Sequence, residues 1–334
     1  MRSFENWGEA MAGPTKFGVF VPQGWKMDLV EIDDPVAKYA AMTAVAKAAD
    51  AEPTIDSIWV YDHFHTIPEP TLETTFECWT ITATLARDTE RVRIGQMVGC
   101  NGYRNPALYA KIASTVDVAS NGRLNAGIGA GWYEHEWLAY GYGFPDALER
   151  LGMLREACQV IHAMWTDDYA TFEGKHYQIN GSINEPKGVQ RPHVPLWIGG
   201  GGEKVTLKLV AQYADACNVG GGNPETCRQK LEILKGHCEA VGRNYDDIIK
   251  STSLDMLLVE DGADRDAAIE ASRQGWSFEQ FSNQFLIGGV DEISERIQSL
   301  IDVGIEYVIV YIPRVAYDHT PMLRYAREVL PRFV

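Results

Sequence analysis

The 334-residue sequence has few basic residues for its length. It contains 30 Lys and Arg against 46 Asp and Glu, which gives a formal net charge of −16. This balance disfavours nucleic acid and anionic membranes as partners. Long apolar runs are also missing, because none approaches the roughly 20 residues that cross a bilayer. The first residues lack the basic start and apolar stretch of a signal peptide, so we expect neither a membrane span nor secretion.

Cysteine is sparse as well. The six cysteines are scattered without any CxxC spacing, which argues against a disulfide framework and against a structural zinc site. Free thiols suit a reducing compartment. We therefore predict a cytoplasmic protein without a metal centre.

Short apolar segments alternate with helical segments along the chain. Eight such strands, with helices between them and after the last, predict an α/β fold of the (β/α)8 TIM barrel type, as a single domain over residues 1–334. A doubly wound sheet is the main alternative, and the strand count disfavours it. A segment at about 169–195, rich in Gly, Pro, Asn and aromatic residues, predicts an inserted hairpin or extended loop. The predicted strands are 16–22, 57–61, 92–98, 123–128, 195–198, 215–219, 251–259 and 307–312.

The ends of these strands are where a barrel builds its active site. The stretch 122–136, GRLNAGIGAGWYEHE, ends its strand in alternating glycines, followed by Trp132, Tyr133 and Glu134. Glycine permits positive φ and removes the Cβ atoms that would keep a flat ligand away. The alternative is an ordinary tight turn.

Four consecutive glycines, Gly199, Gly200, Gly201 and Gly202, lie between a strand and a helix that starts near Glu203. Backbone N–H groups and a helix N-terminus can point together at one anion, so this loop predicts a phosphate site. The loop has neither the GK[ST] of a Walker motif nor the spacing of a Rossmann fingerprint.

A pair of histidines follows the second strand, in Asp62-His63-Phe64-His65. An HxH pair at a barrel strand end is also typical of zinc hydrolases, which need further histidines and a carboxylate after later strands. Here the fifth and sixth strands end in glycines and the last ends in Pro313-Arg314. We therefore interpret His63 as a polar group above a cofactor, with a structural, hydrogen-bonded histidine as the alternative.

Four of these segments, in this order, resemble the luciferase-like oxidoreductases. They are SIWVYDHF, VRIGQMV with YRNPALYAK, DVASNGRLNAGIGAGWYEHE and PLWIGGGG. The likeness is strongest to the branch that uses the deazaflavin coenzyme F420. It implies a barrel, a homodimer, and a flavin or deazaflavin ring across the barrel mouth.

The resemblance also implies roles for individual residues. A non-proline cis peptide at Met97-Val98 would support the ring, and Asp62 and His63 would lie near its reactive edge. The block from Gly129 through Gly131 and Tyr133 to Glu134 would line the ribityl chain, and Gly199 to Gly202 would hold the phosphate.

The sequence departs from the family at two places. Many relatives have Asn where this chain has Tyr133, and the sugar-phosphate dehydrogenase of the family has a catalytic Glu where this chain has Ala130. We expect His63 to move the proton that accompanies hydride transfer, with Glu134 as the second candidate, although Glu134 could equally cap the following helix.

Three functions are compatible with this pattern. The first is an F420-dependent oxidoreductase acting on a small organic substrate, for which Trp132 offers aromatic surface unless it packs in the core. The second is an FMN-dependent luciferase-like monooxygenase on the same scaffold. The third is a cofactor-binding protein without turnover.

Overall fold

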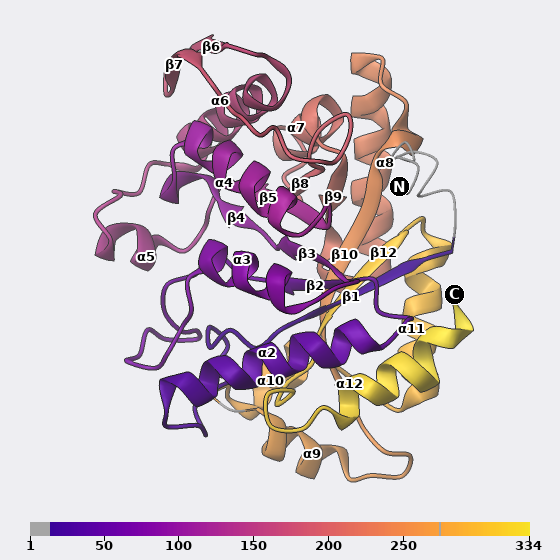
Figure 1. The fold of residues 1–334 in the computed structure, drawn as a ribbon. Coiled ribbons are helices and arrows are strands. Elements are labelled where there is room, and N and C mark those ends of the chain that lie inside the picture. The colour runs from indigo at the N-terminus through magenta and orange to yellow at the C-terminus, as the bar shows by residue number, and fades with distance from the viewer. Residues whose placement is uncertain (1–13, 274) are drawn as a thin grey trace.

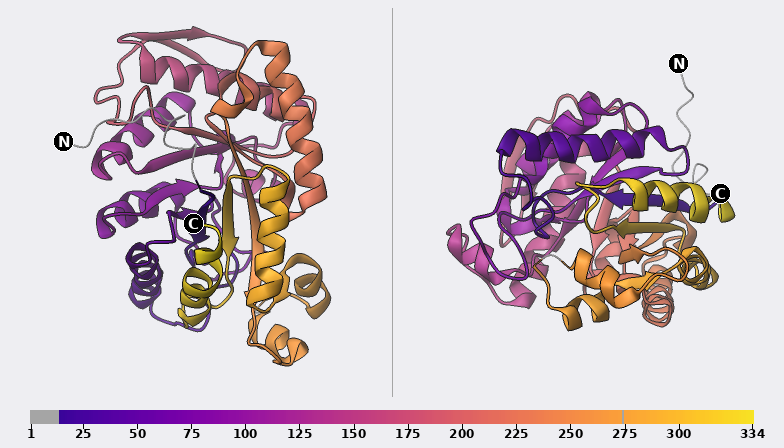
Figure 2. Two further views of the ribbon diagram at one scale, coloured as in Figure 1. Left: turned by 90° about the vertical axis from the view of Figure 1, so that its right-hand side faces the viewer. Right: turned by 90° about the horizontal axis from the view of Figure 1, so that it is seen from below.

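The computed structural model describes residues 14–273 and 275–334. Within them, eight parallel strands form a closed ring, because β9 pairs with β10 and so joins the two ends of the sheet. Figure 1 shows the chain winding around this ring, and Figure 2 shows two further sides. The predicted (β/α)8 barrel is confirmed. In spatial order the ring strands are β1 (Lys16–Phe20), β2 (Ser57–Val60), β3 (Arg93–Gln96), β5 (Leu124–Gly129), β8 (Leu196–Gly199), β9 (Ala216–Asn218), β10 (Ile249–Leu258) and β12 (Tyr307–Tyr311).

Helices cover the outside of the ring. Three of them begin with a capping side chain followed by proline: Asp34, Asn105 and Asn223 each accept a hydrogen bond from a backbone N–H of the first turn. This arrangement fixes where a helix starts, because the cap satisfies a free donor and proline needs none. The helices are α2 (Pro35–Ala51), α3 (Cys78–Asp88), α4 (Pro106–Ala119), α5 (Glu134–Ala139), α6 (Ala147–Thr166), α7 (Thr206–Tyr213), α8 (Pro224–Val241), α9 (Arg265–Ser272), α10 (Phe278–Gln284), α11 (Val290–Asp302) and α12 (Thr320–Arg324).

The structure differs from the prediction at three places. The strand expected at 92–98 stops at Gln96, and a short strand, β4 (Gly99–Cys100), resumes beside β5. A further short strand, β11 (Leu286–Gly288), pairs with the outer side of β10 and was not predicted. The helix expected after the last strand is α12 followed by a π-helical turn (Tyr325–Val329) and a 3-10 turn (Leu330–Arg332).

The inside of the barrel is filled by large aromatic side chains. The rings of Trp59, Trp197 and Tyr307 meet edge to face, with centroids 4.8 to 6.3 Å apart. Two neighbouring strands leave room for Trp59 by having glycine at the facing positions. A Cβ on Gly18 or Gly95 would come within 2.5 Å of the indole. The barrel is therefore a packed core and not a pore.

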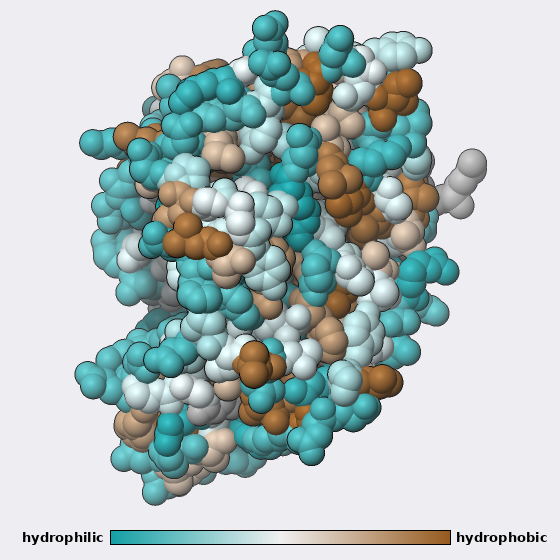
Figure 3. Space-filling view, turned by 90° about the vertical axis from the view of Figure 1, so that its left-hand side faces the viewer, coloured by the Kyte–Doolittle hydropathy of each residue, from teal (hydrophilic) through white to brown (hydrophobic). Residues whose placement is uncertain are grey.

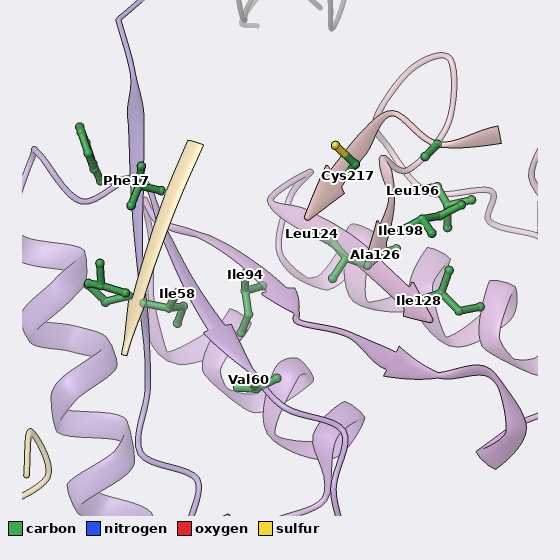
Figure 4. Close-up of a cluster of buried hydrophobic side chains, with 14 of the residues drawn as sticks. Phe17, Ile58, Val60, Ile94, Leu124, Ala126, Ile128, Leu196, Ile198 and Cys217 are labelled. Carbon is green, nitrogen blue, oxygen red and sulfur yellow. The ribbon is translucent and has the colours of Figure 1, made fainter. Parts of the chain in front are cut away.

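The main hydrophobic core lies between the ring and the helices. Alternate residues of the strands point outward into it, as the period of two requires. Figure 4 shows part of this cluster, with Ile58 on β2, Ile94 on β3 and Ile128 on β5, all fully buried. Each strand thus contributes side chains to two cores, one on each side of the sheet. This explains why the strand sequences are nearly continuous apolar runs.

The predicted insert is an antiparallel hairpin of β6 (Ala170–Glu173) and β7 (Gln178–Ser182), followed by an extended segment. Two carboxylates bind its backbone. Glu156 on α6 accepts three N–H groups from Lys175 to Tyr177. Asp117 on α4 accepts the N–H groups of Val189 and Gln190 and the Gln190 side chain. The insert is thus held against the two helices that it follows in the chain.

No helix within the described residues is long and apolar enough to cross a membrane. The prediction of one domain over residues 1–334 includes residues 1–13, which lie outside the described residues, and it stays a prediction.

The anchoring role of Asp117 can be tested by removing its carboxylate. Asp117→Ala should lower the free energy of unfolding by about 3 kcal/mol, because three buried donors lose their acceptor. Urea denaturation measures this change. Asp168→Ala is the control, because Asp168 is exposed and its loss should change stability by less than about 0.5 kcal/mol. Equal effects of the two substitutions would contradict the assignment.

Candidate active site

The break between β3 and β4 is a cis peptide bond between Met97 and Val98, as the resemblance implied. The bond sits where the strand gains one residue over its neighbour. Ile94 pairs with Leu124, a difference of 30 in residue number, but Gly99 pairs with Ile128, a difference of 29. This is a bulge, and it turns the backbone at the carboxyl end of the barrel.

The glycines of β5 and β8 accommodate this bulge. A Cβ on Gly129 or Gly199 would come within 2.7 or 2.8 Å of the Val98 methyl groups, and one on Gly127 would clash with the Gln96 carbonyl at 1.8 Å. From the sequence, this bare backbone was expected to face a ligand. The protein itself fills the space that a Cβ would take at these three positions, while Gly129 and Gly199 still line a cavity.

Two adjoining cavities lie on either side of Met97 and Val98, and both also touch Gly131 and Trp132. The first, which we call the aromatic cavity, measures about 180 Å³. The second, the glycine cavity, measures about 340 Å³. The aromatic cavity is further lined by Trp25, Tyr61, Asp62, His63, Gly99, Cys100, Tyr103 and Tyr133, and the glycine cavity by Gly129, Ala130, Gly199, Gly200, Thr206, Asn218 and Ser253.

Figure 3 views the side of the molecule that carries α5. Hydrophobic side chains are scattered there among hydrophilic ones. Trp132 is 62% exposed, so it is not a core residue. Its ring stacks on that of Tyr133, with ring centroids 5.1 Å apart. Both residues line the aromatic cavity.

His63 is held firmly in the wall of the aromatic cavity. Its Nδ1 lies 2.8 Å from the carboxylate of Glu136, and its ring stacks on Trp25 at 4.1 Å with an interplanar angle of 3°. The Glu136 side chain is fully buried and also accepts hydrogen bonds from the Phe64 N–H, at 2.7 Å, and the Tyr103 hydroxyl, at 2.8 Å. Burial alone would raise the pKa of Glu136, but His63 and these donors hold it below its ordinary value.

An ionised carboxylate can only accept hydrogen bonds, so the hydrogen between His63 and Glu136 belongs to Nδ1. In the neutral imidazole this leaves Nε2 as an acceptor. Glu136 was not predicted as a site residue from the sequence. Its position on the inward face of α5, directly before the buried Trp137, could have indicated it.

Glu134, the predicted second catalytic residue, is exposed in the first turn of α5. It lies on the other face of this short helix from Glu136, because residues two apart do not share a face. The structure therefore brings Glu136, and not Glu134, to His63. Tyr133 does line the aromatic cavity, as the prediction for this block required.

Asp62 is buried and fully used by the protein. Its carboxylate accepts the Cys100 N–H at 2.7 Å and two hydrogen bonds from Arg104, at 2.6 and 3.0 Å. Arg104 also binds Glu77 at 2.5 Å. Burial would lower the pKa of Arg104, but the two carboxylates raise it above its usual value. Asp62 thus fixes the loop after β4 against β2.

The predicted phosphate loop is divided by the structure. Gly199 and Gly200 line the glycine cavity, whereas Gly201 and Gly202 do not. Gly200 has a φ of 117°, which is accessible mainly to glycine. Thr206, the first residue of α7, also lines the cavity. The sequence argument missed Thr206, Asn218 and Ser253 because isolated small polar residues carry no pattern.

The second histidine of the pair, His65, lies near the same carboxylate as His63. Its Nδ1 is 3.8 Å from Glu136, and its Nε2 lies 3.1 Å from His135 Nδ1. Within residues 14–273 and 275–334, no three His, Cys, Asp or Glu side chains gather as metal ligands would.

Comparison with known protein families matches residues 15–286 to the family described as luciferase-like monooxygenase. The chain belongs to this family.

Two relatives are similar to this chain over most of their length. An F420-dependent glucose-6-phosphate dehydrogenase of Amycolatopsis mediterranei is 27% identical over 312 residues, which cover 83% of this chain and 90% of the relative. The enzyme of the same name from Microbacterium testaceum is 28% identical over 279 residues, covering 74% and 80%.

Solved structures of the same fold include an F420-dependent secondary alcohol dehydrogenase, with a TM-score of 0.76, 19% identity, and coverage of 96% of this chain and 98% of that one. A monooxygenase from Streptomyces bottropensis superposes with a TM-score of 0.75, 18% identity, and coverage of 95% and 99%.

The hydrogen bonds of Glu136 predict a dependence of stability on pH. Its pKa is lowered in the folded protein, so its ionised form contributes stability above the ordinary value of 4.5, and this contribution is lost as pH falls through the lowered pKa. Glu136→Gln should lower the free energy of unfolding by about 2 kcal/mol at pH 7.

Urea denaturation between pH 7 and pH 3.5 measures the difference between the two proteins, which should shrink at the acid end. Glu134→Gln is the matched control, because its carboxylate is exposed on the same helix. A difference that stays constant over the whole pH range would refute the role of the Glu136 charge.

Proposed function

We propose that this protein is an oxidoreductase that transfers a hydride between coenzyme F420 and a small organic substrate, with His63 as the group that moves the proton. The observation that carries this proposal is the pairing of His63 with buried Glu136 in the wall of the aromatic cavity, which adjoins the glycine cavity. The names of the curated relatives support F420 as the coenzyme.

The glycine cavity suits a flat, anionic cofactor. Four of its eleven lining residues are glycines, and Met97 and Val98 lie at the junction to the aromatic cavity. Thr206 begins α7, and N–H groups at a helix N-terminus favour an anion. Gly199, Gly200 and Thr206 would bind the phosphate, and Gly129 and Gly131 the chain that joins it to the ring.

The protein supplies binding, orientation and a proton. F420, when bound, provides the acceptor or donor of a hydride. His63 Nε2 accepts the proton of a substrate hydroxyl in the oxidation and returns it to a carbonyl oxygen in the reduction. Glu136 is a positioning residue: it keeps the hydrogen on Nδ1 and stabilises the imidazolium that forms. The aromatic walls exclude water from the reacting atoms.

A second candidate is an FMN-dependent monooxygenase, which the description of the family favours. The fold is common to both, and oxygen chemistry would come from the flavin. A cofactor-binding protein without turnover is the third candidate, in which the His63–Glu136 pair would only stabilise the fold.

Titration of the cofactor-free protein with F420 and, separately, with FMN tests the cofactor by fluorescence quenching. We expect F420 to bind at least about tenfold more tightly than FMN. Thr206→Val removes one hydroxyl from the phosphate end and should weaken F420 binding by about tenfold. Thr115→Val, on α4, lines neither cavity and should leave binding unchanged. A preference for FMN would favour the monooxygenase, and binding of neither would contradict both.

The role of His63 is tested by separating turnover from binding. His63→Ala should lower kcat by a factor on the order of 10³ while the affinity for F420 changes by less than about threefold. Steady-state kinetics and the quenching titration measure the two quantities. Equal losses in both would make His63 a binding residue, and unchanged turnover would exclude it from the reaction.

Two further features stay proposals. The family resemblance supports a homodimer, which light scattering in solution would test. The six free and buried cysteines support a reducing compartment, and hence the cytoplasm.

A further inference from the structure

The aromatic cavity is walled by side chains with large apolar surfaces. Trp25 and Trp132 lie on two sides of His63, with ring centroids at 4.1 and 5.8 Å. Tyr61 packs against Trp25 at 4.3 Å. Such walls gain most from contact with an apolar ring or a branched chain.

Two cations that contact residues of this cavity are already paired. Arg104 is shared between Asp62 and Glu77. Lys26, which follows Trp25 in the chain, is 4% exposed and lies 2.6 Å from Asp255. Its ammonium also sits 4.2 Å from the centre of the Tyr311 ring.

The Lys26–Asp255 pair is held in place from a second element. Gln284 on α10 donates a hydrogen bond to the other oxygen of Asp255, at 2.7 Å. To bind a phosphate group of a substrate, Lys26 or Arg104 would have to give up a buried carboxylate, and the carboxylate would then be left unpaired. The electrostatics of this end of the site therefore oppose a dianionic substrate.

Two polar side chains of the lining are likewise engaged, whereas the buried Trp25 Nε1 has no hydrogen-bond partner among the described residues. Both Asp62 oxygens accept hydrogen bonds from the protein, and the Tyr103 hydroxyl donates to Glu136. His63 Nε2 remains open to the cavity among the described residues. A substrate with many hydroxyl groups would lose its hydrogen bonds to water and gain few in return.

From these contacts we infer that the substrate is a small neutral alcohol or ketone with an apolar ring or branched chain, and not a phosphorylated sugar. This inference rests on the proposed function. In the direction of oxidation, the alcohol carbon loses a hydride to oxidised F420, the hydroxyl proton passes to His63, and the carbon–oxygen single bond becomes a carbonyl. The reduction reverses each transfer.

Binding to the F420-loaded protein tests the substrate class without reliance on turnover. Loading is measured first by fluorescence quenching, so a protein that does not bind F420 contradicts the proposed function itself. The loaded protein is then titrated in a calorimeter with 2-butanone, cyclohexanone and glucose 6-phosphate. At least one ketone should bind about tenfold or more tightly than the sugar phosphate.

Two variants connect this preference to the aromatic cavity. Trp132→Ala should weaken ketone binding on the order of fivefold, because it removes one apolar wall. Leu138→Ala is the matched control, since Leu138 is 57% exposed on α5 and lines neither cavity. Tighter binding of glucose 6-phosphate, bleaching of F420 by it, or equal effects of the two variants would overturn the inference while leaving F420 dependence intact.

Discussion

The close packing of Val98 onto bare glycine backbone is the constraint on which the site depends. The bulge at Met97-Val98 pushes this side chain against the ends of β5 and β8, where Gly129 and Gly199 leave no Cβ to oppose it. The wall between the two cavities is therefore built from the backbone of three neighbouring strands. A wall of this kind is stiff, because its position follows from strand pairing and not from a side-chain rotamer.

The buried carboxylate of Glu136 connects this wall to the reactive side chain. It gathers donors from the segment after β2 and from the turn after β4. Without such an acceptor, the loop after β2 would carry unpaired N–H groups in a buried place, which is costly. The same carboxylate that stabilises the loop thus also orients His63. In the proposed function, fold stability and proton transfer would therefore depend on the same carboxylate.

Much of the fold and part of the candidate site could be predicted from the sequence. Strands and caps have local signals, so the barrel and the starts of α2 and α4 follow from apolar runs and from Asx–Pro pairs. The cis peptide and His63 came from the family resemblance. Glu136 did not, because its role arises from contacts with residues 63 and 103, which no local pattern reveals. The glycines were noticed, but their partner Val98 could be identified only in three dimensions.

The two cavities draw on different parts of the chain. Apart from the residues around Met97 and Trp132, the aromatic cavity is formed by segments that follow β1, β2 and β4. The glycine cavity uses the ends of β5, β8 and β9, the middle of β10 and the start of α7. In the proposed assignment, substitutions that change the substrate would fall in one part of the gene, and the residues that bind the coenzyme in the other. A family with this arrangement could then change its substrate without losing its coenzyme at an intermediate step.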